Sequence, residues 1–506
     1  MKLIPKTFTL YRSKTMWEPS LVAWSFFILT LLFTTFLPNI LKKKKYNDQN
    51  DQNDQSRTRY KFPSGRRSWP VIGDSFNWYS AIASSHPSKY VEEQAKRYGK
   101  IFSCRVFGKC TVVSVDPDFN RYVMQNEGIL FQSSYPKSFR DLVGVNGVIT
   151  AQGEQQRKLH GIASNFMRIN KLNFSFIKEI QTIIIHSLTT FHDRHQIISL
   201  QDACRKIAIN LMVSQLLGVS SDSEVNEISG LFYDFVDGCL SFPINLPPFA
   251  YHSAMKARKQ IIRKIKKKIE MQKSMEKSSS SGHGVLGRLL EEQKHLCDEA
   301  VEDFIINLLF AGNETTSKTM LFAVYYLTHS PKAFEQLMEE QDGLRNKCGD
   351  NTVTWEDYKS MSFTQCVIDE TLRLGGIAIW LMRETKEEIK YSDYVIPKGT
   401  FVVPFLSAVH LDENIYDEAL TFNPWRWMQL QNQEKRNWKS SPYFAPFGGG
   451  GRLCPGAELA RLQIALFLHH FLTNYRWTQI KEDRMSFFPS ARLVNGFQIR
   501  LERREH

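Results

Sequence analysis

The sequence of 506 residues predicts a mainly α-helical protein with a smaller β region, built as one large domain behind one amino-terminal helix. Three patterns predict this fold class. Val301–Thr328 is a long apolar stretch that ends before Pro331, which is typical of a buried central helix. A second apolar helix is expected directly after Gly456. Asn495-Gly496 is a strong type I′ turn signal, so two short strands should flank it.

The formal net charge of +13 is concentrated in two segments. Residues 1–67 hold 13 basic and 4 acidic side chains, and residues 251–277 hold 10 basic and 2 acidic ones. These segments carry +9 and +8, which leaves −4 for the rest of the chain. A body with this charge is not arranged to bind nucleic acid, so no nucleic-acid partner is expected.

An uncharged run of 21 residues, Leu21–Leu41, predicts a membrane anchor. As a helix it is long enough to cross a hydrocarbon core of about 30 Å. Four lysines follow it directly, and no small-residue cleavage pattern follows, which favours an anchor over a cleaved signal peptide. The denser positive charge after the run favours a cytosolic body, and a translation start at Met16 would remove the basic charge before it.

We therefore expect residues 1–45 to form the anchor with its basic flanks, residues 46–73 a polar linker with a Pro/Gly hinge, and residues 74–506 the remaining domain. Within that domain, Lys256–Lys268 alternates basic residues with isoleucines and predicts an amphipathic helix after the apolar segment Phe242–Phe249. Two interpretations stay open for this helix: a solvated basic face above a core-facing isoleucine stripe, or a second contact with the membrane surface.

The middle of the predicted central helix contains two residues that are unfavourable there. Gly312 costs a helix about 1 kcal/mol relative to Ala, and a buried Glu314 costs more unless it is paired. Two such costs in one place indicate a functional site within Phe310–Thr316. The alternative is that Thr315 only donates a hydrogen bond to a carbonyl one turn back and bends the helix.

Cys454 differs from the other seven cysteines. None of the eight forms a CxxC pair or has a histidine at zinc-finger spacing. Cys454 follows four consecutive glycines, which allow a flat ligand to approach the backbone, and it precedes a helix amino terminus, which favours a thiolate. Such a thiolate is a natural axial ligand of haem iron, and Arg452 could pair with a haem propionate. The loop lacks the Gly-Lys-Ser/Thr ending of a phosphate-binding loop.

These residues resemble two motifs of the cytochrome P-450 superfamily, the haem-thiolate monooxygenases. The haem loop F-x-x-G-x-R-x-C-x-G is matched by Phe447, Gly450, Arg452, Cys454 and Gly456. The A-G-x-D/E-T-T motif is matched by Ala311, Gly312, Glu314, Thr315 and Thr316. The resemblance implies the cytochrome P-450 fold and haem b (iron protoporphyrin IX) bound through Cys454, with a local opening of the central helix over the iron. It also implies that Thr315 donates a hydrogen bond to the oxygen being activated and that Glu314 helps to relay protons.

The same resemblance assigns scaffold and cofactor contacts. Glu370 and Arg373 match the E-x-x-R pair, and Arg426 matches the arginine that joins it in a buried charged network. Arg383 matches an arginine that binds a haem propionate. The usual W/H-x-x-x-R helix is altered here, because Gln156 and His160 occupy its two positions. His160 is kept as a cofactor candidate, and Arg157 or Lys158 could substitute for it.

Three segments resemble a plant branch of the family that contains brassinosteroid oxidases and oxidases of gibberellin precursors, triterpenoids and other terpenoids: Ser134–Phe139, Asp357–Cys366 and Phe422–Trp427. The substrate implied is a small, apolar, polycyclic molecule, first of all a sterol or steroid of the brassinosteroid type. By the same resemblance, the residues expected to face it are Leu142, Val145, Leu309, Phe310, Ile377, Ala378, Leu381, Leu493 and Val494.

The function expected is oxidation of that substrate with O2 and with electrons from NADPH. They would arrive through a separate NADPH-cytochrome P-450 reductase, because the sequence has no flavin or nicotinamide fingerprint. The expected location is the endoplasmic reticulum membrane, with one span, contact with membrane lipid and a cytosolic catalytic domain. Three alternatives remain: a triterpenoid, diterpenoid or other terpenoid oxidase; a reductase-independent haem isomerase or dehydratase; and a non-enzymatic haem protein that binds a ligand.

Overall fold

The computed structural model describes residues 60–66, 73–82, 84–106, 108–168, 174–194, 197–218, 221–276, 298–346, 352–487 and 490–504. From Phe62 onwards these residues belong to one compact unit. The predicted anchor Leu21–Leu41 and most of the predicted linker lie outside the described residues. No helix within the described ranges is both long and apolar enough to cross a membrane.

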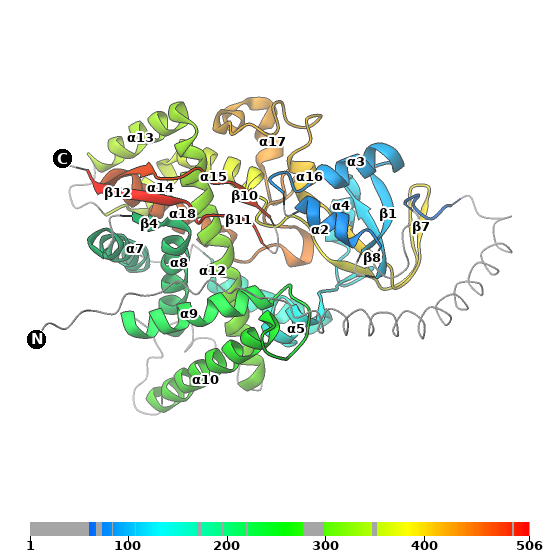
Figure 1. Cartoon of the computed structure of the whole chain (residues 1–506), viewed down its shortest axis with the longest axis horizontal. Helices are drawn as coiled ribbons and strands as arrows, with labels where there is room; N and C mark the ends of the chain where they lie inside the picture. The colour runs from blue at the N-terminus through cyan, green and yellow to red at the C-terminus, as the bar shows by residue number, and fades with distance from the viewer. Residues whose placement is uncertain are drawn as a thin grey trace, which may run out of the picture. The chain divides into compact units, whose positions relative to one another are not determined.

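Helices make up most of the unit (Figure 1). The α-helices are α2 (Ser75–Ile82), α3 (Lys89–Tyr98), α4 (Pro117–Gln125), α5 (Lys137–Val143), α6 (Gly153–Phe166), α7 (Phe174–Arg194), α8 (Leu200–Leu217), α9 (Asp222–Gly238), α10 (Ala250–Glu276), α12 (Asp298–Thr328), α13 (Pro331–Arg345), α14 (Trp355–Ser360), α15 (Ser362–Leu374), α16 (Leu406–His410), α17 (Gln433–Arg436) and α18 (Ala457–Asn474). Short 3₁₀ helices are η2 (Pro424–Met428), η3 (Leu430–Asn432) and η4 (Gly450–Arg452).

The β region consists of small sheets. Its strands are β1 (Ile101–Val106), β2 (Lys109–Ser114), β3 (Phe131–Ser133), β4 (Ile197–Ser199), β5 (Arg383–Thr385), β6 (Ile389–Tyr391), β7 (Tyr394–Ile396), β8 (Phe401–Pro404), β9 (Tyr475–Gln479), β10 (Met485–Ser486), β11 (Arg492–Leu493) and β12 (Gln498–Arg503). The largest sheet has the order β1-β2-β8-β5-β3, and in it β2 and β8 run parallel. The others have the orders β4-β12-β9, β6-β7 and β10-β11.

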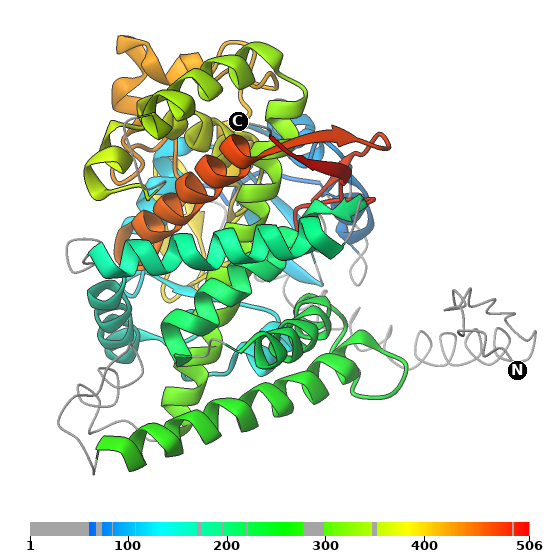
Figure 2. The ribbon, with the colours of Figure 1, turned by 90° about the vertical axis from the view of Figure 1, so that its left-hand side faces the viewer.

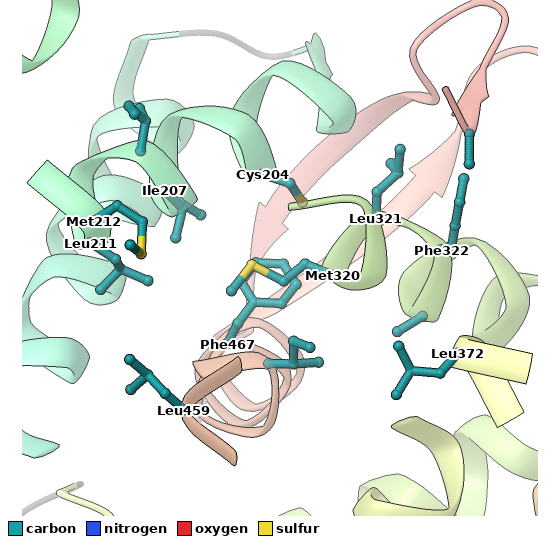
Figure 3. Close-up of a cluster of buried hydrophobic side chains, with 14 of the residues drawn as sticks. Cys204, Ile207, Leu211, Met212, Met320, Leu321, Phe322, Leu372, Leu459 and Phe467 are labelled. Carbon is teal, nitrogen blue, oxygen red and sulfur yellow. The ribbon is translucent and has the colours of Figure 1, made fainter. Parts of the chain in front are cut away.

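The central helix α12 begins three residues before the predicted stretch and ends at Thr328 as predicted. It passes through the middle of the helical part and packs against α8, α15 and α18 (Figure 1, Figure 2). Apolar side chains of these four helices meet around Met320 and Phe322 (Figure 3). Packing also accounts for Gly312, because a Cβ there would lie 2.4 Å from the sulfur of Met212 on α8. The glycine therefore lets α8 approach α12 closely.

The isoleucines of the basic helix α10 agree with the first interpretation of this helix, a core-facing isoleucine stripe below a solvated basic face. Ile261, Ile265 and Ile269 are 1%, 0% and 3% exposed, so they form a core-facing stripe. Two lysines pair with acidic residues of α9: Lys264 with Glu227 at 2.6 Å and Lys268 with Glu224 at 3.3 Å. Lys256, Lys259 and Lys267 are exposed, so α10 also presents a basic surface.

The expected strands on either side of Asn495-Gly496 are present as β11 and β12, but they do not form a hairpin. β11 pairs with β10, whereas β12 pairs with β4 and β9. The reason is Asp483, whose carboxylate accepts hydrogen bonds from the amides of Asn495 at 2.9 Å and Phe497 at 2.7 Å. Because these two amides donate to the side chain of Asp483, they do not pair β11 with β12, and the two strands join different sheets.

A buried ion cluster lies at the end of α15. Glu370 accepts hydrogen bonds from Arg373 at 2.8 and 3.0 Å, from Arg426 at 3.0 Å and from the indole of Trp427 at 2.9 Å. The side chains of Glu370 and Arg373 are fully buried, and that of Arg426 is 4% exposed. The structure thus brings the E-x-x-R pair and Arg426 together around one carboxylate.

The cluster continues to the segment that precedes Cys454. Arg373 donates to the carbonyl of His410 at 2.7 Å, and the ring of His410 accepts a hydrogen bond from the amide of Ala445 at 3.1 Å. Burial, assisted by the charge of Arg373, lowers the pKa of His410 to about 3. The ring is therefore neutral at physiological pH, as an acceptor of an amide hydrogen must be.

Replacing Glu370 by Gln should destabilise the protein strongly. The variant keeps the side-chain shape but leaves Arg373 and Arg426 as buried cations without a carboxylate, which costs about 3–5 kcal/mol. Urea unfolding measures this difference. The matched control is Glu356→Gln, which breaks an exposed pair with Lys359 and should cost at most about 1 kcal/mol. Equal losses in the two variants would contradict the prediction.

Candidate active site

A cavity of about 310 Å³ lies between α12 and the loop that carries Cys454. Helix α12 contributes Leu308, Ala311, Gly312, Thr315, Thr316 and Thr319 to its lining. The loop and the start of α18 contribute Pro446, Phe447, Gly448, Gly449, Arg452, Cys454, Pro455, Gly456, Leu459 and Ala460. The two predicted motifs, which are about 140 residues apart in the sequence, therefore share one mostly apolar cavity.

Tight turns form the Cys454 loop. The amide of Cys454 donates to the carbonyl of Phe447 at 3.0 Å, and that of Leu453 donates to Gly450 at 3.1 Å. Gly450 has a φ of 62°, and a Cβ there would lie 1.9 Å from the carbonyl oxygen of Met124, so no other residue fits.

Burial raises the pKa of the Cys454 thiol, and the amide of Gly456 opposes this shift only in part. The helix amino terminus acts on the sulfur in the expected direction, because the amide of Gly456 lowers the pKa, while burial has the larger, opposite effect. A cation bound directly to the sulfur would favour the thiolate further.

Helix α6 contacts the same loop through the two altered positions. Gln156 donates from Nε2 to the carbonyl of Gly451 at 3.1 Å. The Nε2 atom of His160 lies 2.6 Å from the carbonyl oxygen of Leu453, the residue before Cys454. Both side chains also line the cavity. Where the family motif has an aromatic residue and an arginine, this chain fixes two loop carbonyls with a glutamine and a histidine.

Two arginines predicted to bind propionates meet at one buried carboxylate. Arg383 is placed by β5, and its Nε lies 2.5 Å from one oxygen of Glu127. Arg452 donates from Nε to the other oxygen at 2.6 Å. Arg383 and Arg452 both line the cavity, whereas Glu127, missed by the sequence prediction, joins them from the turn after α4. No pattern around Glu127 in the sequence distinguished it from a surface residue.

Thr315 faces the cavity, but its hydroxyl donates to the carbonyl of Ala311 one turn back at 2.7 Å. Thr319 repeats this contact with the carbonyl of Thr315 at 3.0 Å. Helix α12 continues without a break from Asp298 to Thr328, so the local opening implied by the resemblance is not present. The back-bond of Thr315 is the contact that the alternative interpretation of this residue predicts.

Glu314 is buried next to Lys318 and does not line the cavity. Its Oε1 atom also accepts a hydrogen bond from the hydroxyl of Ser490 at 3.1 Å. Burial alone would raise the pKa of Glu314, but the charges of Lys318 and Arg205 outweigh burial and hold it below its usual range. Burial lowers the pKa of Lys318 despite the opposing charge of Glu314. The predicted proton donor is thus one half of an ion pair adjacent to Thr315.

Three of the nine predicted substrate contacts, Ile377, Ala378 and Leu381, line the cavity. The other six are not part of this lining: Leu142, Val145, Leu309, Phe310, Leu493 and Val494. Leu142, Leu309 and Leu493 are core residues, and Val145 and Val494 are 62% and 48% exposed. Phe310 packs against Phe139 and Phe235. Lining residues that the prediction missed include Tyr135, Ile149, Met212 and Gln463, which carry no motif.

These residues fit a haem. Within the described part of the chain, no group of three or more His, Cys, Asp or Glu could hold a metal ion. A single thiol facing a mostly apolar cavity suits an iron whose other ligands come from a macrocycle. Three glycines beside Cys454 and Ala311 and Gly312 opposite the loop leave room for a flat ligand. Arg383, at the edge of the cavity, provides a cation for a carboxylate.

Comparisons with known proteins identify the family. The model of the family Cytochrome P450 matches residues 63–497, so this chain belongs to that family. The chain is 45% identical over 445 residues to the abietadienol/abietadienal oxidase of Pinus taeda, covering 88% of this chain and 91% of that protein. It is 36% identical over 460 residues to the steroid (22S)-hydroxylase of Oryza sativa subsp. indica, covering 88% and 89%.

Among solved structures, retinoic acid-bound cyanobacterial CYP120A1 matches with a TM-score of 0.77 at 24% identity, covering 88% of this chain and all of that one. The predicted fold class is confirmed: a P450 fold, mainly helical with a small β region, in a single domain. The predicted enzyme class is confirmed as well, since the chain is a monooxygenase of the oxidoreductase class. Membership of the family implies a haem, a redox partner and an apolar substrate.

Replacing Lys318 by Met should protonate Glu314 at neutral pH. The change removes the cation that opposes the effect of burial, so the pKa of Glu314 should rise. Infrared spectroscopy detects a protonated carboxyl by its C=O stretch, which should appear in Lys318→Met and be absent from Lys318→Met/Glu314→Gln.

The stability of the two proteins should also differ in acid. In the wild type the pKa of Glu314 is lower in the folded than in the unfolded protein, so the ionised side chain stabilises the fold at pH values above its ordinary pKa. This stabilisation is lost as the pH falls through the lower pKa of the folded protein. Lys318→Met should not show this loss of stability in acid. An ionised Glu314 in Lys318→Met would contradict the prediction.

Proposed function

We propose that this protein uses haem b, bound through Cys454, to oxidise an apolar polycyclic terpenoid-derived substrate with O2. The observation that carries the proposal is the single cavity lined by both Cys454 and Thr315. The thiol is the metal ligand, and the hydroxyl is on the helix that forms the facing wall. The carboxylate of Glu314 lies one residue away on that helix.

When bound, the haem supplies iron for O2 activation. The residues of this chain orient the thiol, exclude water and move protons. Gln156 and His160 fix the carbonyls of Gly451 and Leu453 within the Cys454 loop, which orients the thiol. Apolar side chains such as Leu381 exclude water from the cavity. Thr315, released from the carbonyl of Ala311 by rotation of its side chain, donates into the cavity, and the pair of Glu314 and Lys318 resupplies the proton.

The two curated relatives reported above support a substrate among polycyclic isoprenoids, because one is named as a diterpenoid-type oxidase and the other as a steroid hydroxylase. The identity is higher to the abietadienol/abietadienal oxidase, at 45%, than to the steroid hydroxylase, at 36%. We therefore place a tricyclic diterpenoid alcohol or aldehyde beside the sterol predicted from the sequence. Ile377, Ala378 and Leu381 would contact its hydrocarbon skeleton.

The proposal includes a separate NADPH-cytochrome P-450 reductase as electron donor and attachment to the endoplasmic reticulum membrane through Leu21–Leu41, with the catalytic domain in the cytosol. A second membrane contact is proposed at residues 242–249, which precede α10. Four apolar side chains of this segment are exposed: Phe242 by 82%, Ile244 by 39%, Leu246 by 63% and Phe249 by 44%. This segment, and not the basic helix α10, suits insertion among lipid chains.

The central test is the spectrum of the reduced carbon monoxide complex. The wild type should show the Soret band of a thiolate-ligated haem, and Cys454→Ala should lose it. Turnover of a diterpenoid alcohol or a sterol should require NADPH and reductase. In Thr315→Ala, turnover per NADPH consumed should fall about 10- to 100-fold, because a proton donor is missing.

Three results would contradict the proposed function. Survival of the thiolate band in Cys454→Ala would remove the proposed ligand. Aerobic conversion of a lipid peroxide without NADPH, unaffected by Thr315→Ala, would favour the isomerase or dehydratase instead. A haem spectrum without turnover of any terpenoid or sterol would favour a protein that only binds a ligand.

Contact of residues 242–249 with lipid can be tested in full-length protein reconstituted in lipid nanodiscs. Phe242→Trp adds a fluorophore in the proposed contact, and its fluorescence should be quenched by bromine-labelled lipid chains. The matched control is Leu430→Trp, at a site that is 89% exposed on η3. Equal quenching at the two positions, each corrected for the wild-type signal, would contradict the proposed contact.

A further inference from the structure

The segment of residues 143–151, called here the 143–151 loop, connects α5 to α6 and forms one wall of the cavity. Val148 and Ile149 line the cavity directly. The loop is folded on itself: the hydroxyl of Thr150 donates to the carbonyl of Gly144 at 2.6 Å, and the amide of Ala151 donates to Gly147 at 2.9 Å. Its conformation therefore determines where two cavity-lining side chains lie.

Two side chains of α12, one helical turn apart, hold the backbone of this loop. Asp303 accepts a hydrogen bond from the amide of Asn146 at 3.2 Å. Asn307 accepts one from the amide of Ile149 at 3.1 Å and donates to the carbonyl of Val143 at 2.5 Å. Asn307 is fully buried and Asp303 is 7% exposed, so water does not compete for these contacts.

Two glycines let the loop approach α12. A Cβ at Gly144 would lie 2.0 Å from the carboxylate of Asp303, and one at Gly147 would lie 2.0 Å from the amide of Asn307. Gly144 also has a φ of 89°, which favours glycine. The close contact thus depends on the two polar side chains of α12 and on the two glycines of the loop.

Arg452 holds the loop from the opposite side. Its terminal nitrogens donate to the carbonyls of Ile149 at 2.8 Å and Ala151 at 2.7 Å. The peptide groups of Ile149 are therefore fixed on one side by Asn307 and on the other by the loop that carries Cys454. A third element joins through Arg258 of α10, which pairs with Asp303 at 2.6 Å and donates to the carbonyl of Leu142 at 2.8 Å.

We propose that Asp303 and Asn307 are positioning residues that fix the 143–151 loop as a rigid wall of the cavity. They thereby set the rate at which small molecules reach the site and the shape of the substrates that fit. The statement about substrates rests on the proposed function, whereas the statement about the rigid wall does not. Neither residue touches the reacting atoms, so each acts through Val148 and Ile149.

Hydrogen–deuterium exchange of the full-length holoenzyme tests the rigid wall directly. In Asn307→Leu, which keeps the side-chain size but removes both hydrogen bonds, the amides of residues 143–151 should exchange about 10-fold faster, since a buried hydrogen-bond partner is lost. Asp303→Asn keeps the acceptor for Asn146 and loses the charge opposite Arg258, so a smaller acceleration is expected. The matched control is Asn120→Ala, which removes a buried asparagine of α4 whose side-chain atoms have no hydrogen-bond partner among the described residues. It should leave the loop unchanged.

Carbon monoxide rebinding after flash photolysis tests access to the site. The Asn307→Leu holoenzyme should keep the thiolate-type spectrum and rebind carbon monoxide several-fold faster than the wild type and Asn120→Ala. If Asn307→Leu does not fold, Asn307→Asp serves, because it keeps the acceptor for Ile149 and loses the donor to Val143.

The outcomes separate this proposal from the proposed function. Unchanged exchange and unchanged rebinding in folded variants of Asp303 and Asn307 would overturn the rigid wall. Absence of a thiolate spectrum from the wild type would overturn the proposed function and leave the exchange experiment valid. In a terpenoid and sterol panel, Asn307→Leu should raise KM for the preferred substrate several-fold more than it lowers kcat, and an unchanged KM would contradict the effect on substrate fit.

Discussion

The buried carboxylate of Glu370 is the interaction on which the active site depends most. It is shared by the cations of Arg373 and Arg426 in a place without solvent, and three backbone carbonyls complete the shell of Arg373. Through the neutral ring of His410 the cluster reaches the amide of Ala445, two residues before the Cys454 loop begins at Phe447. Because a buried charge without its partner costs several kcal/mol, this arrangement has few alternatives of similar energy, and the start of the loop is fixed.

The same principle applies to the walls of the cavity. Each charged group next to the cavity has a partner: Glu314 has Lys318, Asp303 has Arg258, and Glu127 has Arg383 and Arg452. Pairing lets charge be buried beside an apolar ligand site at an acceptable cost. It also links elements that are distant in the sequence, since Arg452 joins the Cys454 loop to the 143–151 loop and Arg258 joins α10 to α12. The contacts of Arg452, Asp303 and Arg258 therefore connect the Cys454 loop, α12 and α10 through the 143–151 loop.

The sequence was sufficient for the features with strong local signals. The apolar period of Val301–Thr328, the Gly-rich loop before Cys454 and the E-x-x-R pair placed the central helix, the thiol and the ion cluster near their observed positions. Prediction from the sequence failed where contacts between residues distant in the sequence determine the structure. Asp483 changed a predicted hairpin into a bridge between sheets, and Met212 gave Gly312 a packing role. Six of the nine predicted substrate contacts are not part of the cavity lining, although Leu309 and Phe310 lie beside the lining residues Leu308 and Ala311 in the sequence.

Helix α6 differs from the family motif at positions 156 and 160, and this difference changes which groups its side chains bind. An aromatic residue and an arginine at positions 156 and 160 would have reached toward the carboxylates of a cofactor, whereas Gln156 and His160 bind the carbonyls of Gly451 and Leu453. Arg452, with its three nitrogens bonded to Glu127, Ile149 and Ala151, is occupied by the protein itself. Arg383 is bonded by the protein too, to Glu127 and to the carbonyl of Met382. Burial raises the pKa of Cys454 and the amide of Gly456 lowers it, so a cation bound at the sulfur would add to the effect of the helix amino terminus. Binding of the cofactor would then be linked to ionisation of the thiol.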